Sequence, residues 1–308
     1  MHKYIIRRLL MLIPVIIGVT FIVYSIMFFT PGDPALIILG ENAPEEQVEK
    51  LREEMGLNDP FIIQYLRFLK NALKGDFGRS YSTRKPVFNE VFSRFPATLK
   101  LSTAGLLLAV AIGIPIGIIS ATRQYSLLDS ITMVLALLGV SMPNFWLGLM
   151  LILLFSVRLG LLPSGGDVGF ASLILPAITL GTGVAAIITR MTRSSMLEVI
   201  RQDYIRTARA KGVAERRVIN KHALKNALIP VVTVIGLQFG YLLGGAVLTE
   251  TVFSWPGVGR LMVEAIKQKY TPVVLASVIF MSVVFSIVNL LVDILYAFLD
   301  PRIKSQYR

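Results

Sequence analysis

The chain of 308 residues contains six long stretches that hold no charged side chain. Each stretch is long enough to cross the hydrocarbon core of a bilayer as a helix, at 1.5 Å rise per residue. Charged residues are thus missing from whole stretches of the chain and not thinned out evenly. This pattern predicts an all-α, polytopic membrane protein with six transmembrane helices. We place these helices at residues 9–29, 101–122, 130–157, 168–189, 227–249 and 271–292.

The first stretch also fits a cleaved signal peptide, because Lys3, Arg7 and Arg8 precede it. Its 21 uncharged residues exceed a usual signal core, and it ends in Phe29-Thr30-Pro31 rather than in a small-x-small cleavage site. We therefore interpret it as a permanent helix that starts in the cytoplasm.

Charge is distributed unevenly between the two sides that six crossings define. Residues 190–225 hold ten basic and three acidic side chains, whereas residues 30–97 hold nine basic and ten acidic ones. Cytoplasmic loops collect Lys and Arg, so we expect residues 190–225 and both termini to be cytoplasmic. This orientation accounts for the net charge of +12 without a nucleic-acid partner.

The domain layout follows from these spans. Residues 1–29 form the first transmembrane helix, and residues 30–97 form an external helical domain. Residues 98–300 form a five-helix core with a loop at 190–226 and an external segment at 250–270, and residues 301–308 form a cytoplasmic tail.

Two helices are predicted within the external domain. Asn42 can cap the first, with Gly56 as its stop, and Asp59-Pro60 can start the second, which Gly75 ends. The second helix has an apolar stripe at helical spacing, which favours packing within the domain over packing on another protein. The stripe consists of Phe61, Ile62, Tyr65, Leu66, Leu69 and Leu73.

Several kinds of chemistry are excluded by the composition. The chain has no cysteine and only two histidines, which rules out thiolate chemistry and a histidine-rich metal site. No Gly-Lys dipeptide occurs, so no Walker A loop exists. The spans hold no interior charge and no catalytic constellation, which counts against a proton-coupled carrier and against a membrane-embedded hydrolase. We expect no catalytic residues, no metal site and no cofactor bound by this chain.

The most informative segment is residues 190–230, which is too long and too patterned for a simple hairpin. Asp203 is a plausible helix start, and Gly212 can end that helix in a left-handed conformation. A short helix with small residues, among them Ala208 and Ala210, suits insertion into a groove of another protein. The alternative is a solvated basic loop that only fixes orientation.

This segment resembles the coupling loop of ATP-binding-cassette importer permeases, and most closely the dipeptide, oligopeptide and nickel permease family. The motifs that carry the resemblance span nearly the whole chain in the same order. They are Pro31-Gly-Asp-Pro34, Gly75-Asp-Phe-Gly-Arg-Ser80, Ser141-Met-Pro-Asn-Phe145, Asp203-Tyr-Ile-Arg-Thr-Ala-Arg-Ala-Lys-Gly212, His222-Ala-Leu-Lys-Asn-Ala-Leu-Ile-Pro230, Glu250-Thr-Val-Phe-Ser-Trp-Pro-Gly-Val-Gly259 and Leu299-Asp-Pro-Arg302.

The chain departs from the general importer pattern at one position. That pattern has Glu-Ala-Ala, three residues and Gly, whereas this chain has Arg206-Thr207-Ala208, three residues and Gly212. The missing glutamate, together with a longer spacing from Gly212 to Pro230, is similar to the peptide subfamily. It leaves open which contact position 206 makes.

The resemblance implies a permease of a bacterial or archaeal cytoplasmic membrane that pairs with a homologous permease. Two cytoplasmic ATPase subunits would carry ATP and magnesium, and an external solute-binding protein would deliver the cargo. Closure of the ATPases would move a coupling helix seated in an ATPase groove. The implied coupling residues are Asp203, Tyr204, Arg206, Thr207, Ala208, Lys211, Gly212 and Val213.

A second group of residues is predicted near the translocation path or the binding protein, from the resemblance for residues 250–270 and from polarity at membrane depth for Asn144 and Asn289. The segment 250–270 fits either an interfacial helix or a segment dipping toward the path, and Pro-Gly-x-Gly favours the second. Asn144 and Asn289 fit either the path or helix–helix hydrogen bonds. The candidates are Asn144, Glu250, Phe253, Trp255, Pro256 and Asn289.

Cargo is left open among di- and oligopeptides, a nickel complex and glutathione, with peptides favoured because an uncharged path does not trap charged peptide termini. Two other classes of protein stay open as rivals. One is an ATP-independent secondary carrier, which would transport without partners. The other is a scaffold that docks a cytoplasmic partner through residues 190–225 and moves nothing.

Overall fold

The structure is a computed structural model that describes residues 2–40, 42–80 and 85–299. Within these residues the chain is helical, and the only β-pairing is an isolated bridge between Arg79 and Pro86. The all-α prediction is confirmed. The elements are α1 (His2–Phe29), α2 (Pro34–Leu39), α3 (Glu45–Met55), α4 (Phe61–Ala72), α5 (Val87–Thr122), α6 (Leu127–Ser141), α7 (Asn144–Leu151), the π-helix η1 (Ile152–Arg158), α8 (Phe170–Ile200), α9 (Asp203–Ala210), α10 (Glu215–Arg217), the π-helix η2 (Val218–Ala223), α11 (Leu224–Val252), α12 (Val258–Lys267) and α13 (Thr271–Leu299).

Five stretches of helix in the described residues are long and apolar enough to cross a bilayer. They comprise most of α1, then α5, α8, the run from α10 through α11, and most of α13. A sixth crossing exists if α6 and the α7–η1 pair, which meet at an angle of 102°, count as one span. The predicted cytoplasmic tail at residues 301–308, like the motif that ends at Arg302, lies outside the described residues.

The predicted transmembrane helix at residues 130–157 is not continuous in the structure, because it breaks between α6 and α7. Met142 has an extended backbone, with ψ of 122°, and Pro143 precedes the first residue of α7. Proline has no N–H to continue the ladder and pushes the preceding residue out of the helical region. Asn144 is therefore the first residue of a new helix.

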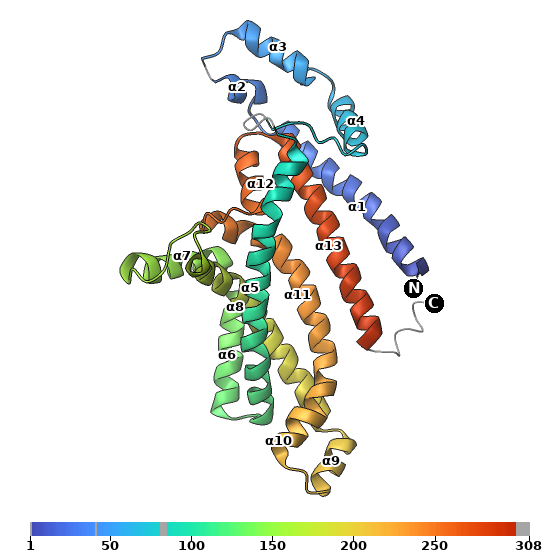
Figure 1. Cartoon of the computed structure of the whole chain (residues 1–308), viewed down its shortest axis with the longest axis vertical. Coiled ribbons are helices and arrows are strands. Elements are labelled where there is room, and N and C mark those ends of the chain that lie inside the picture. Colours follow the sequence, from blue (N-terminus) through green and yellow to red (C-terminus); the bar gives the residue numbers. More distant parts are fainter. Residues whose placement is uncertain (1, 41, 81–84, 300–308) are drawn as a thin grey trace. The chain divides into compact units, whose positions relative to one another are not determined.

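The chain divides into two compact units, which we describe separately (Figure 1). Of the described residues, the first unit contains 99–255 and 285–299 together with residues 2–5. In this unit α8 packs against α6, α7 and α11. Glycines bring α5 close to α8: a Cβ at Gly117 would lie 2.6 Å from Thr192, and a Cβ at Gly113 would lie 2.8 Å from Ile188. Small residues that let backbones approach are the usual device of helix packing in membranes.

The second unit contains residues 6–98 and 256–284. Its core joins the first turns of α5 to α12 and to the start of α13, around Val87, Val91, Val258 and Val273. The aromatic ring of Phe280 meets the edge of Phe95 at 5.1 Å between centroids. The second unit thus has a hydrophobic core of its own.

The small helices α2, α3 and α4 belong to this second unit (Figure 1). Gly56 ends α3 in a left-handed conformation, as expected, but the residue before α3 is Pro44, so Asn42 is not its cap. Helix α4 begins after Pro60 and ends at Ala72, before the predicted stop at Gly75. The expected cap by Asp59 is also wrong, because its side chain pairs with Arg67 instead.

Candidate functional site

Helix α9 lies at one end of the first unit, beyond the ends of α8 and α11 (Figure 1). One apolar side chain seats it: Ile205 is fully buried among Met196, Val218 and Ala223. Val213 and Ala208 pack against the same cluster. An otherwise polar helix of eight residues is thus fixed to the bundle through a single buried side chain and two partly buried neighbours.

The end of α9 takes the shape that the sequence predicts. Gly212 has φ of +75°, and its N–H donates to the carbonyl of Arg209 at 2.9 Å. A Cβ on Gly212 would meet nothing within 4 Å, so glycine is favoured there by backbone conformation and not by lack of space. The reversal returns the chain toward Glu215, which begins α10.

Two side-chain contacts brace this reversal. Arg209 donates from Nε and Nη2 to the two carboxylate oxygens of Glu215, at 3.0 and 2.7 Å. The hydrogen bond to Glu215 raises the pKa of the Arg209 guanidinium above its usual value, which keeps it charged. The amide of Asn226 donates to the hydroxyl of Tyr204 at 2.8 Å. Together these contacts tie one end of α9 to α10 and the other end to the first turn of α11.

The remaining side chains of α9 face outward. Asp203 and Arg206 are exposed over 98% and 74% of their side chains, and 3.7 Å separates their charged groups. Thr207 and Lys211 are exposed as well. The structure therefore brings the eight predicted coupling residues into one short motif, with Ala208 and Val213 turned inward and the polar ones available to a partner.

The second group of predicted residues comes from three segments: the start of α7, the end of α11 with the residues that follow it, and α13. Glu250, Phe253 and Trp255 are buried, while Pro256 and Asn144 are half-buried. Asn289 lies in α13 next to Gly240 of α11, where a Cβ would be 3.4 Å from its Oδ1. The assignment of these residues to the translocation path or to the binding protein stays a prediction.

Phe253 and Trp255 are held by the loop between η1 and α8 and by Lys100 of α5, all in the first unit. The N–H of Gly166 donates to the carbonyl of Phe253 at 2.8 Å, and Gly165 approaches so closely that a Cβ would lie 2.3 Å from that oxygen. The ammonium of Lys100 lies 5.1 Å from the centre of the Trp255 ring and pairs with Asp167 at 2.6 Å. These residues form a packed corner of the fold.

Sequence reasoning missed an ion pair between α6 and α8. Arg193 donates from Nε and Nη2 to Oδ1 and Oδ2 of Asp129, at 2.6 and 2.7 Å. The Ser120 hydroxyl and the Tyr125 N–H also donate to this carboxylate, which is almost fully buried. The usable signal was an acidic residue and a basic residue close to the ends of two apolar stretches.

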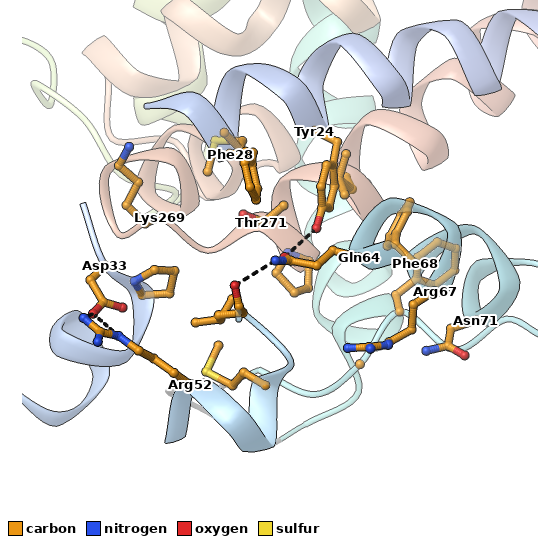
Figure 2. Close-up of a pocket in the computed structure, with 18 of the residues that line it drawn as sticks. Tyr24, Phe28, Asp33, Arg52, Gln64, Arg67, Phe68, Asn71, Lys269 and Thr271 are labelled. Atoms are coloured by element: carbon orange, nitrogen blue, oxygen red, sulfur yellow. Dashed lines mark hydrogen bonds and ion pairs between the residues drawn. The ribbon is translucent and has the colours of Figure 1, made fainter. Parts of the chain in front are cut away.

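A cavity of about 500 Å³ lies in the second unit (Figure 2). Its charged wall includes Asp33, which accepts from Arg52 at 2.6 and 2.9 Å and from the N–H of Ala35. Another lining carboxylate, Asp76, accepts from the N–H of Gly78. Across the described residues, no group of three His, Cys, Asp or Glu side chains suits a metal ion.

Comparison with known proteins assigns the chain to a family. The model of binding-protein-dependent transport system inner membrane components matches residues 113–305, and the model of the N-terminal part of such components matches residues 1–102. The dipeptide transport system permease protein DppB of Alkalihalophilus pseudofirmus is 47% identical over 99% of this chain and all of its own length. The glutathione transport system permease protein GsiC of Escherichia coli strain K12 is 45% identical over 99% of each chain.

Solved structures agree in fold. An inward-facing structure of the MetNI methionine ABC transporter has a TM-score of 0.55 at 19% identity and covers 68% of this chain and 96% of its own. The crystal structure of an amino acid ABC transporter with histidines has a TM-score of 0.53 at 14% identity, over 70% and 94% of the two chains.

The curated relatives are named as permease proteins of transport systems, in agreement with the expected transport subunit. The resemblance that the sequence motifs indicated is confirmed. The chain belongs to the family of binding-protein-dependent transport system inner membrane components.

Proposed function

We propose that this permease imports di- and oligopeptides and forms the translocation pathway together with a homologous permease. Two cytoplasmic ATPase subunits drive it, and an external solute-binding protein delivers the peptide. The observation that carries the proposal is α9, a short polar helix held rigidly beyond the helix bundle by Ile205 and by the Arg209–Glu215 pair.

The coupling step depends on the rigidity of α9. A helix that is braced at both ends and seated by a buried side chain transmits displacement instead of absorbing it. Asp203, Arg206 and Lys211 offer charged contacts to an ATPase groove. The chain needs no nucleotide or magnesium of its own in this mechanism, because both are bound by the ATPase subunits.

The orientation rests on charge. With α9 in the cytoplasm, the loop of residues 190–225 places its surplus of seven positive charges, ten basic minus three acidic, on the side where basic residues collect. Both termini then lie in the cytoplasm of a bacterial or archaeal cell, and α2 to α4 belong to the external side.

The choice of peptides is supported by the dipeptide permease relative at 47% identity. Glutathione is a second candidate cargo, favoured by the glutathione permease relative at 45% identity, and it is itself a tripeptide. Nickel complexes remain the third alternative, and a carrier without partners is the least favoured.

Competition for uptake tests the cargo. We expect proteoliposomes that contain the complete transporter, its binding protein and internal ATP to accumulate a labelled dipeptide, and nonhydrolysable nucleotide to abolish uptake. An excess of unlabelled dipeptide should lower the rate by about tenfold, whereas free amino acids and nickel should leave it unchanged. Uptake of nickel with no peptide competition would contradict the proposal, and competition by glutathione alone would favour the second candidate.

A further inference from the structure

Helix α4 has two apolar faces, of which only one is covered. Phe61 and Tyr65 pack against α1, where Tyr65 is buried beside Tyr24. On the other face Ile62, Ile63 and Leu66 are exposed over 54%, 49% and 56% of their surface. The predicted packing of the whole stripe within the domain is therefore only half correct, and the uncovered half needs an occupant.

The contacts of α4 reach far along the membrane-spanning helix α1. The hydroxyl of Tyr65 donates to the carbonyl of Ile17 at 2.9 Å and lies 3.1 Å from the hydroxyl of Thr20. The hydroxyl of Tyr24 donates to Gln64 at 3.0 Å, as Figure 2 shows. Phe61 contacts Phe28 at the end of α1, with 5.2 Å between ring centroids.

These contacts set the depth of α4. The apolar span in α1 runs from Ile5 to Phe29, and Ile17 lies twelve residues before its end. At 1.5 Å per residue this is a depth of about 18 Å, in a hydrocarbon core about 30 Å thick. A side chain of α4 that bonds to Ile17 therefore reaches roughly the middle of the bilayer, which an aqueous domain beside the membrane cannot do.

The polar groups of α4 that face α1 have hydrogen-bond partners, so burying them at this depth carries little free-energy penalty. The Gln64 amide donates to the carbonyls of Leu57 and Asp59 at 2.9 and 2.7 Å and accepts from Tyr24. A polar group without a hydrogen-bond partner is destabilising in hydrocarbon, and each of these groups has a partner. Lys70 follows Leu66 by one turn and is exposed, so its long stem can carry the ammonium to the headgroups.

We infer that α4 is embedded in the leaflet in which α1 ends at Phe29, with Ile62, Ile63 and Leu66 in contact with lipid acyl chains. With twelve residues, α4 is too short to span but long enough to lie within one leaflet. The exposed apolar surface of α1 covers the same depth, because Ile22 and Ile26 are exposed over 59% and 61%. Lipid thus covers the exposed face of α4, as it covers the exposed face of α1.

Single cysteines can test this placement cleanly, because the natural chain has none. Ile62→Cys and Leu66→Cys probe the uncovered face. Glu54→Cys, at an exposed position of α3, is the matched aqueous control, and Ile22→Cys on α1 is the lipid control. Each variant is reconstituted in the complete transporter in phosphatidylcholine vesicles and labelled with a bimane maleimide. Quenching is then measured with iodide in water and with a doxyl group on the lipid chains.

We expect Ile62→Cys and Leu66→Cys to behave like Ile22→Cys: strong quenching by doxyl lipid, and quenching by iodide about tenfold weaker than at Glu54→Cys. Iodide quenching equal to that at Glu54→Cys would place the face in water and overturn the inference. Weak quenching by both agents would show that a protein partner covers the face, and would overturn it as well. None of these quenching results depends on which cargo the transporter carries.

Discussion

Replacing Ile205 by Asp is expected to release the ATPase subunits from the permease and to lower ATP-driven peptide uptake about 100-fold. Ile205 is the fully buried side chain that seats α9 among Met196, Val218 and Ala223. A carboxylate in that apolar cluster loses its hydration without gaining a partner, so α9 is expected to leave its seat. The measurement is retention of ATPase subunits on the affinity-purified permease, together with uptake into proteoliposomes.

Gln202→Asp is the matched control, because it adds the same charge to the same loop at an exposed position just before α9. An Asp at this cap position favours the helix, so both readouts are expected to stay near wild type. Ile205→Val keeps the seat apolar and should give a small loss. If Ile205→Asp retained its ATPases as fully as Gln202→Asp, the seating of α9 would not matter for coupling.

Removing one partner of the Asp129–Arg193 pair is expected to destabilise the first unit strongly. In Asp129→Asn the Arg193 guanidinium keeps its charge but loses its bidentate acceptor in a mostly buried site. Breaking such a pair costs about 3 kcal/mol, which corresponds to a fall of roughly 5–10 °C in the unfolding midpoint. The measurement is the loss of the monodisperse gel-filtration peak after heating in detergent.

The chain offers an exposed ion pair for comparison. Glu264 pairs with Arg260 one turn earlier on α12 at 2.7 Å, and both side chains are at least one-third exposed. Glu264→Gln should therefore change the midpoint by no more than about 1–2 °C. The double variant Asp129→Leu with Arg193→Met removes both charges and should recover most of the loss. Equal midpoints for Asp129→Asn and Glu264→Gln would refute the structural role of the buried pair.

The transmembrane architecture was largely predictable, because absence of charge over about 20 residues has few other physical explanations. The break at Pro143 was visible in the sequence as a residue that cannot continue a helix, yet hydropathy averages over it. The true start of α5 at Val87 was hidden because three charged residues of the helix, Glu90, Arg94 and Lys100, come before the uncharged block that begins at residue 101. A helix can continue beyond its apolar span through polar and charged residues.

The site was predictable where a local rule applies and not where distant segments meet. The left-handed Gly212 and the start of α9 at Asp203 follow from neighbours in sequence. The burial of Phe253 and Trp255 depends on Gly165 and Lys100, which lie far away in the chain. The Asp129–Arg193 pair joins residues 64 positions apart, so no periodicity could reveal it.

A photo-crosslink from α9 tests the central claim, that this helix docks on the ATPase subunits. Arg206→Cys carries a benzophenone maleimide on the exposed face of α9, and Glu54→Cys, an exposed position on α3, carries the same reagent as the control. In the intact complex, irradiation should join the permease to an ATPase subunit from position 206 and not from position 54. A complex that co-purifies with its ATPases yet gives no crosslink from position 206 would contradict the assignment of α9 as the coupling helix.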